Sequence, residues 1–135
     1  MKVLLDTHVW LWWLLGSERL QPQERRSLDR LAASRSSHIA AMSLWEAQML
    51  HAKGRLSLDR TFQTWLRQAI APGDVQLLPI DVEVVIALDQ LPEDFHGDPA
   101  DRLIVATGLA HGLLLATYDR AIRSSAVIAI WQGSS

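Results

Sequence analysis

Short apolar runs alternate with helix-like segments along almost the whole chain, and this alternation restricts the fold more than any other feature. The runs at residues 2–6, 38–41, 75–80, 113–116 and 127–131 have the composition of strands. Helical patterns occupy residues 7–15, 22–33, 43–53, 58–70, 82–91 and 99–110, and a short helix starts at Asp119. This order predicts an α/β fold of three layers, in which helices flank a central, mostly parallel sheet of about five strands.

The composition predicts a single domain that spans residues 1–135. Hydrophobic residues make up 49% of these 135 residues, which is enough for one core, and a second domain has no room. The chain has no cysteine, so any metal must be held by carboxylates or histidines, which favours a hard cation. The apolar run at residues 9–15 is too short for a signal peptide or a membrane span, so we expect a cytoplasmic protein with no membrane partner.

The charge balance argues weakly against a protein that binds nucleic acid by bulk electrostatics. The net charge is −2, whereas such domains are usually basic. Of the 13 basic residues only Lys2 and Lys53 are lysines, so the cationic surface is almost entirely arginine, the better bidentate ligand for phosphate.

Acidic residues occur where predicted strands turn into helices. Asp6 closes the first strand, Glu46 lies in the first turn after the second strand, and Asp119 follows the strand at residues 113–116. Asp98 and Asp101 open the helix at residues 99–110. Because strand-to-helix loops of a parallel sheet open on the same edge, we expect these carboxylates to converge.

Each acid also has a purely structural explanation. Asp6, Asp98 and Asp119 are good helix caps, Asp101 is a favourable first-turn acid, and Glu46 is three residues after Ser43 as in a capping box. Caps accept Ser, Thr or Asn equally well, however, and here each of these junctions carries an acid. Converging carboxylates stay ionised together only when a cation neutralises them, and a site of oxygen ligands suits Mg²⁺ or Mn²⁺.

Four motifs in register resemble the PIN domain, specifically the VapC-type toxins of prokaryotic toxin-antitoxin pairs. They are Leu-Leu-Asp-Thr-His at residues 4–8, Ser-Leu-Trp-Glu at 43–46 with Lys-Gly-Arg-Leu at 53–56, His-Gly-Asp-Pro-Ala-Asp-Arg-Leu-Ile at 96–104, and Leu-Ala-Thr-Tyr-Asp at 115–119. Each motif alone is weakly specific, but together they cover nearly the whole chain in the family's order. Ala100 stands where the family often has a bulky apolar residue, a departure that concerns packing more than chemistry.

The resemblance implies a PIN-like fold and a Mg²⁺-dependent endoribonuclease that cleaves RNA. It also implies a cognate antitoxin that wraps the toxin with its carboxy-terminal segment, and a homodimer. Carried over by position, the family's acidic quartet falls on Asp6, Glu46, Asp101 and Asp119, with Asp98 as an additional acid. Thr117 matches a hydroxyl position that supports the site.

We assign the acids to roles in a metal-activated hydrolysis. Asp6 and Asp101 are expected as direct ligands, Glu46 as a ligand or as the group that orients the water, and Asp119 as a ligand through water or an outer support. Mn²⁺ is a plausible substitute for Mg²⁺. The basic residues near the motifs either hold RNA phosphates or are ordinary solvated surface, and these are Lys53, Arg55, Arg102, Arg120 and Arg123.

Two other functions fit parts of the pattern. A phosphotransfer domain, such as an aspartate-nucleophile phosphatase or a receiver, also has acids at strand ends, but it uses a late lysine, and no lysine follows Lys53. A non-catalytic binding module would use its acids only as caps.

The helix at residues 7–15 is apolar on all sides, which is unusual for a helix on the surface of a soluble domain. Trp10, Trp12 and Trp13 lie within four residues, with Trp12 on a different side from the other two. Either these rings all pack in the core, or some of them line a groove that receives an amphipathic antitoxin helix.

Overall fold

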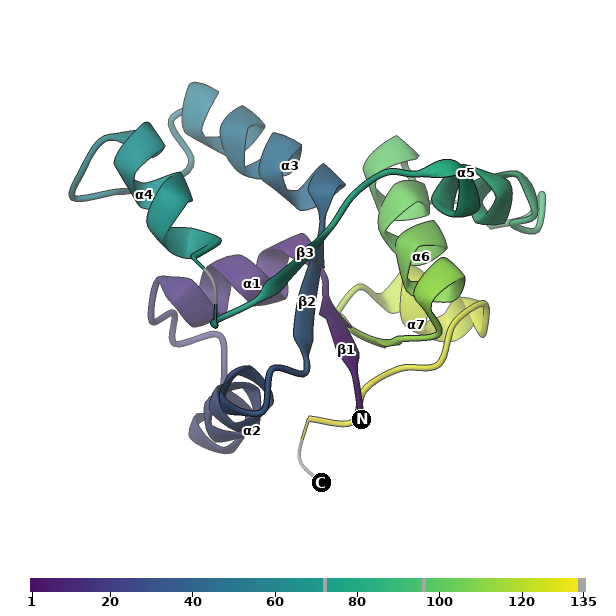
Figure 1. Ribbon diagram of the computed structural model, residues 1–135, viewed down its shortest axis with the longest axis horizontal. Helices are drawn as coiled ribbons and strands as arrows, with labels where there is room; N and C mark the ends of the chain where they lie inside the picture. Colours follow the sequence, from purple (N-terminus) through teal and green to yellow (C-terminus); the bar gives the residue numbers. More distant parts are fainter. Residues whose placement is uncertain (72, 96, 134–135) are drawn as a thin grey trace.

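Four parallel strands form the centre of the structure (Figure 1). The computed structural model describes residues 1–71, 73–95 and 97–133; His96, the first residue of the third motif, lies outside the described residues. The strands stand in the order β3-β2-β1-β4. Their bounds are β1 (Val3–Leu5), β2 (Ser37–Ala40), β3 (Gln76–Leu78) and β4 (Leu114–Ala116).

Helices cover both faces of this sheet. In Figure 1, α1, α2 and α4 lie on one side of the strands and α5, α6 and α7 on the other, so the predicted three-layer α/β/α fold is confirmed. α3 follows β2 and contacts both α1 and α6. The helices are α1 (Thr7–Leu14), α2 (Pro22–Ala33), α3 (Ala41–Ala52), α4 (Phe62–Ala69), α5 (Val82–Asp89), α6 (Pro99–His111) and α7 (Arg120–Ser125).

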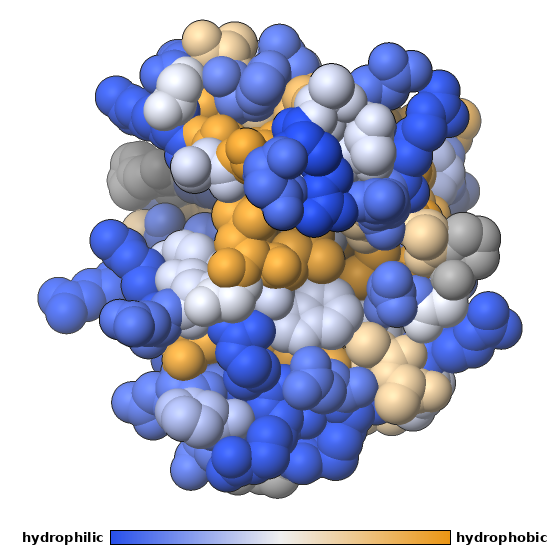
Figure 2. Space-filling view, turned by 90° about the vertical axis from the view of Figure 1, so that its left-hand side faces the viewer, coloured by the Kyte–Doolittle hydropathy of each residue, from blue (hydrophilic) through white to orange (hydrophobic). Residues whose placement is uncertain are grey.

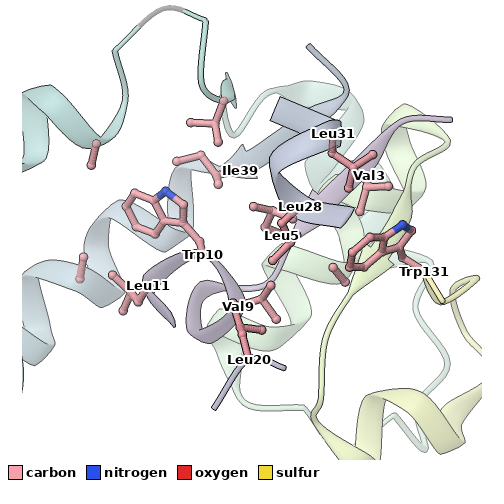
Figure 3. Close-up of a cluster of buried hydrophobic side chains, with 14 of the residues drawn as sticks. Val3, Leu5, Val9, Trp10, Leu11, Leu20, Leu28, Leu31, Ile39 and Trp131 are labelled. Carbon is pink, nitrogen blue, oxygen red and sulfur yellow. The ribbon is translucent and has the colours of Figure 1, made fainter. Parts of the chain in front are cut away.

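The strands are buried on both faces because their side chains alternate between two cores. Val3 and Leu5 point into the core beneath α1, α2 and α4, where Trp10 also lies (Figure 3). Leu4 points into the opposite core, which contains Ile104 of α6 and Ile122 of α7. This double burial fixes the register of β1 between its two neighbours.

Trp10 is part of the first core. Its side chain is 0% exposed, and its ring centroid lies 5.9 Å from that of Trp65 in α4. Of the two alternatives that the sequence left open for this ring, core packing therefore applies to Trp10. This burial explains part of the apolar character of α1, because Trp10 packs in the core with Trp65 of α4.

The last predicted strand is reduced to a single bridge. Within the described residues the sheet has four strands, and the segment at residues 127–131 meets it only where Ile130 pairs with Leu115. Two backbone hydrogen bonds make this contact, from Leu115 N–H to the Ala129 carbonyl (3.0 Å) and from Trp131 N–H to the Leu115 carbonyl (2.9 Å). Trp131 then turns into the core, which ends the pairing.

The start of α3 also differs from the prediction. The helix begins at Ala41, two residues before Ser43, and Ala40 occupies the N-cap position without a side-chain hydrogen bond. Ser43 and Glu46 therefore do not form a capping box, and both side chains are free for other contacts. None of the helices in the described part of the chain is long and apolar enough to cross a membrane.

Candidate functional site

The pairing of β1 with β4 brings the two ends of the chain together at the carboxyl edge of the sheet. Leu5 is in register with Ala116, and the Asp6 N–H donates to the Ala116 carbonyl at 3.0 Å. The next residues, Asp6 and Thr117, are consequently neighbours although 111 positions separate them. Asp6 is also the N-cap of α1, so both the sheet and the helix fix its backbone.

Three groups surround the Asp6 carboxylate, which is almost fully buried. One oxygen, Oδ1, accepts the Thr7 N–H at 2.8 Å, and the other, Oδ2, accepts the Thr117 hydroxyl at 2.7 Å. His8 Nδ1 lies 3.5 Å from Oδ2. These contacts hold the carboxylate in one orientation, and one of them comes from Thr117, the hydroxyl residue that the family resemblance singled out.

Glu46 lies in the second turn of α3 and is tied to α1 through Thr7. The Thr7 hydroxyl donates to Glu46 Oε1 at 2.6 Å, and its oxygen lies 2.8 Å from Ser43 Oγ. Burial raises the pKa of Glu46 and the charges of Asp6 and Asp98 raise it further, against the opposing effect of the Thr7 hydrogen bond. Ser43 thus supports the acid through Thr7 and not through a helix cap.

Asp98 and Asp101 perform different tasks at the start of α6. Asp98 is the exposed N-cap, and its Oδ1 accepts the Asp101 N–H at 2.8 Å. Asp101 is half-buried, and burial is the main cause that raises its pKa to about 7. The negative charges of Asp98, Asp6, Asp119 and Glu46 add to this shift.

Asp119 caps α7 and is attached to the same network. Its Oδ1 accepts the Ile122 N–H at 3.0 Å, while its own N–H donates to Thr117 Oγ1 at 3.1 Å. Thr117 therefore links Asp119 to Asp6 through one hydroxyl group.

The four acids of the predicted quartet share one pocket, which has a volume of about 290 Å³. Asp6, Glu46, Asp101 and Asp119 all line it, whereas Asp98 does not. We call it the acidic pocket. Its other lining residues are Thr7, His8, Leu11, Trp12, Leu15, Leu50, Arg55 and Leu56.

The chemistry of the acidic pocket suits a hard divalent cation. Four carboxylates line it, and the charges of the other acids add to the effect of burial on the pKa of Asp101, a repulsion that a bound cation would relieve. Oxygen is the ligand atom that Mg²⁺ and Mn²⁺ prefer. Across residues 1–71, 73–95 and 97–133 no three acid or histidine side chains are already gathered closely enough to hold a metal ion.

His8 and Thr7 belong to the site, although the sequence reasoning did not select them. The Tyr118 N–H donates to His8 Nε2 at 3.1 Å, so the neutral ring carries its proton on Nδ1, the atom that faces Asp6. Burial lowers the pKa of His8, which favours this neutral form over the attraction of Asp6 and Asp119. Thr7 and His8 come directly after Asp6 in the sequence, and this position was the signal that could have identified them as site residues.

The basic residues proposed as phosphate contacts are dispersed. Arg55 lines the acidic pocket, and Lys53 and Arg120 are exposed. Arg102 instead donates to the Phe95 carbonyl at 3.0 Å, and Arg123 donates from Nε to the Thr117 carbonyl at 2.7 Å. These two arginines hold the ends of the site's loops, so the structure favours a structural role for them.

The remaining tryptophans of α1 point in different directions. Trp12 lines the acidic pocket. Trp13 points toward α2, where its Nε1–H donates to Asp29 Oδ1 at 2.8 Å. Together with the buried Trp10, this arrangement excludes one groove lined by all three rings.

Comparisons with known proteins agree with this architecture. The PIN domain family matches residues 3–127. The ribonuclease VapC22 of Mycobacterium tuberculosis (strain ATCC 25618 / H37Rv) is 38% identical over 125 residues, which cover 90% of each chain. Among solved structures, VapBC2 of Rickettsia felis bound to a promoter DNA fragment aligns with a TM-score of 0.73, at 15% identity over 97% of this chain and 98% of that one. DNA-bound VapBC of Salmonella typhimurium aligns with a TM-score of 0.69, at 20% identity over 97% of both chains.

Proposed function

The chain belongs to the PIN domain family, and on this premise we propose that it is a metal-dependent endoribonuclease controlled by a cognate antitoxin. The observation that carries the proposal is the convergence of four carboxylates in one pocket, with the pKa of Asp101 raised to about 7. The identity of 38% with a ribonuclease supports RNA as the substrate.

In this proposal the acids hold the cation and the attacking water. Bound Mg²⁺ or Mn²⁺ lowers the pKa of a water molecule and neutralises the charge that develops on the phosphate oxygens. Asp6 and Asp101, which line the pocket, would hold the ion directly, and Glu46 would be a further ligand or would orient the water. Asp119 supports the ion through water or from outside its direct ligands.

The hydrogen bonds around the acids have a catalytic purpose in this scheme. Thr7 and Thr117 fix the Asp6 carboxylate before substrate binds, so little reorganisation is needed during reaction. Thr7 also donates to Glu46, which keeps these two acids at a constant separation. His8 presents its Nδ1 toward Asp6 at 3.5 Å.

The antitoxin would bind in a groove beside the acidic pocket. Figure 2 shows hydrophobic surface at the centre of the face that carries α1, α2 and α4, surrounded by hydrophilic residues. A groove of about 380 Å³ between α1 and α4 has apolar and polar lining residues, which are Leu14, Leu15, Leu58, Trp65 and Ala69 with Ser57, Asp59, Arg60 and Gln68. Because Leu15 also lines the acidic pocket, an amphipathic helix in the groove can direct an arginine of its tail onto the carboxylates and displace the cation.

We further propose that the protein forms a homodimer through α5. Val82, Val85 and Ile86 of this helix are exposed by 72%, 50% and 45%, an unusual density of apolar surface on one helix. Val85→Glu would place a charge in such an interface. We expect this variant to have half the wild-type mass in solution, whereas an unchanged mass would place the dimer contact elsewhere or exclude it.

The decisive experiment measures cleavage of single-stranded RNA by the purified chain. We expect cleavage with Mg²⁺ or Mn²⁺, loss of cleavage with EDTA, and recovery when Mg²⁺ is restored. The product of the adjacent antitoxin gene should suppress cleavage and shift the tryptophan fluorescence. Cleavage that EDTA leaves intact contradicts the metal mechanism, and a folded protein that cuts no RNA is instead a binding module.

A further inference from the structure

A column of aromatic rings stands at the wall of the acidic pocket. Trp12 and Tyr118 are nearly parallel, with ring centroids 5.7 Å apart and an interplanar angle of 29°. The His8 ring packs beside both, with centroids 4.9 Å from Trp12 and 6.2 Å from Tyr118. The guanidinium of Arg19 lies 5.5 Å from the Trp12 centroid, and that of Arg123 lies 5.4 Å from the Tyr118 centroid.

The inner part of this column is firmly held. The Tyr118 hydroxyl donates to Glu24 Oε2 in α2, and the Tyr118 N–H donates to His8. Arg123 is fixed to the Thr117 carbonyl. The Tyr118 ring that packs against Trp12 is therefore held in place before any ligand binds. Stacking of a ligand on Trp12 would consequently cost the protein little additional side-chain entropy.

The outer part is open to a ligand. Trp12 is partly exposed and lines the acidic pocket, and the Arg19 side chain above it is exposed on the segment between α1 and α2. Arg19 makes a cation-π contact with the Trp12 ring, and an incoming planar group can replace or share this contact. A planar group entering here would lie between an aromatic face and a guanidinium.

The acidic pocket is lined by both charged and apolar side chains. Beside the carboxylates, its lining includes Trp12 with Leu11, Leu15, Leu50 and Leu56. A nucleotide combines the same two kinds of group, since one sugar joins its charged phosphate to its flat base. A phosphate held at the carboxylates and a base stacked on Trp12 would therefore occupy the same pocket.

Electrostatics alone cannot explain how RNA would be held here. The acids of the pocket repel phosphates until a cation binds, and the chain as a whole carries a net charge of −2. Base stacking on aromatic rings supplies affinity that does not depend on positive charge and tolerates any base. Among the residues lining the pocket, Trp12 offers the largest aromatic face for this purpose.

We propose that Trp12, supported by Tyr118, is a stacking platform for the nucleobase next to the scissile phosphate. The substrate is therefore RNA in which this base is unpaired, because a base within a duplex cannot reach the ring. This inference rests on the proposed ribonuclease function and specifies the form of its substrate.

The test combines a protein variant with a modified substrate. After the cleaved bond of a single-stranded oligonucleotide has been mapped with wild-type protein, the bases on either side of it are removed one at a time as abasic nucleotides. Trp12→Leu keeps apolar bulk without an aromatic face, Trp12→Phe keeps a smaller face, and Trp45→Leu is the matched control on α3, where a tryptophan is 52% exposed and does not line the pocket.

We expect Trp12→Leu to raise KM about tenfold, with a smaller change in kcat, and Trp12→Phe to raise it less. The abasic nucleotide next to the cleaved bond should raise the wild-type KM similarly and abolish the difference between wild type and Trp12→Leu. Pairing the oligonucleotide with its complement should prevent cleavage. Fluorescence anisotropy with Asp101→Asn as the non-cleaving parent should show the same tenfold loss of RNA affinity when Trp12→Leu is added.

Several outcomes separate this inference from the proposed function. If the wild-type protein cuts no RNA in Mg²⁺, the proposed function fails and the platform fails with it. If cleavage is normal but Trp12→Leu leaves KM unchanged, or raises it equally for the abasic substrate, only the platform is overturned. An unchanged KM with weaker antitoxin inhibition assigns Trp12 to the antitoxin. If Trp12→Leu does not fold, the wild-type abasic series decides, because a flat KM across all positions excludes stacking.

Discussion

Asp81 and Asp119 cap their helices in the same way, yet only one of them lies in the acidic pocket. Asp81 Oδ1 accepts the Val84 N–H at 3.0 Å at the start of α5, and Asp119 Oδ1 accepts the Ile122 N–H at 3.0 Å at the start of α7. Both follow a parallel strand closely. Asp81 is exposed, whereas Asp119 lines a pocket together with three other acids.

Strand order produces this difference. β4, which precedes Asp119, is hydrogen-bonded to β1, which precedes Asp6. β3, which precedes Asp81, stands at the far edge of the sheet and is separated from β1 by β2. An acid that follows a strand can therefore cap the next helix wherever the strand stands in the sheet. It joins the acidic pocket only when its strand stands close to β1, which carries Asp6 at its end.

The largest effect should come from an acid proposed to hold the ion directly. Asp101→Asn removes a carboxylate whose pKa is raised first by burial and further by the other acids. We expect RNA cleavage to fall by more than about 100-fold, since even outer supports of metal sites cost 10- to 100-fold. Cleavage assays with Mg²⁺ measure this. Circular dichroism should show an intact fold, and near-normal cleavage by a folded variant would remove Asp101 from the metal site.

The matched pair Asp119→Asn and Asp81→Asn separates a cap in the pocket from a cap outside it. Asn keeps the oxygen that accepts the cap hydrogen bond, so both variants should be as stable as wild type. We expect cleavage to fall about 10- to 100-fold for Asp119→Asn and to remain unchanged for Asp81→Asn. Equal cleavage by the two variants would show that Asp119 is only a cap.

Stability without metal should depend on pH through Asp101. Because its pKa is about 7 in the folded protein and about 3.8 in the unfolded chain, the native state retains a proton that the unfolded chain has lost between these values. The contribution is complete below pH ~3.8 and disappears as the pH rises to about 7. We expect a loss of about 2 kcal/mol across this window, after allowing for solvent screening of a half-buried group.

Urea unfolding in EDTA at several pH values measures this loss. Asp101→Asn should abolish the slope that Asp101 causes, and Mg²⁺ should recover stability at pH 7 in the wild type only. A wild-type slope identical to that of Asp101→Asn would contradict the raised pKa of Asp101 in the folded protein.

The smallest effect concerns the cap that has no further role. Asp81→Ala removes the hydrogen bond to Val84 N–H, and we expect the free energy of unfolding to fall by about 1 kcal/mol with no change in RNA cleavage. Thermal unfolding together with a cleavage assay tests both parts. A fall in cleavage would show that α5 influences the pocket.

The sequence predicted the layers of the fold because helical and strand periodicities are local signals. It predicted the acids that line the pocket through their position after strands and the family resemblance. It also placed the start of α3 at Ser43, because a serine is a good cap, whereas the structure uses that hydroxyl on Thr7. A local sequence pattern predicts a hydrogen bond between residues that are close in sequence. In the structure the Ser43 hydroxyl instead contacts Thr7, which is 36 positions away.

The contacts that the sequence could not predict all depend on strand order. His8 accepts the Tyr118 N–H only because β1 is next to β4, and no local pattern encodes that neighbour. The final predicted strand fails for a similar reason, since Trp131 packs into the core after one bridge instead of extending the sheet. The directions of the α1 tryptophans likewise depend on α2 and α4, which lie elsewhere in the sequence.

The pairing of the first strand with the last has a consequence for biosynthesis. A ribosome releases the amino end first, so β1 and Asp6 emerge long before β4, Thr117 and Asp119 exist. Contacts between such distant parts of a chain form late in folding, because a long loop must close before they are made. A nascent chain that ends before β4 contains Asp6, Glu46 and Asp101 but lacks the strand and the hydroxyl that orient Asp6. The topology thus delays assembly of the acidic pocket until β4 and Asp119 have been translated.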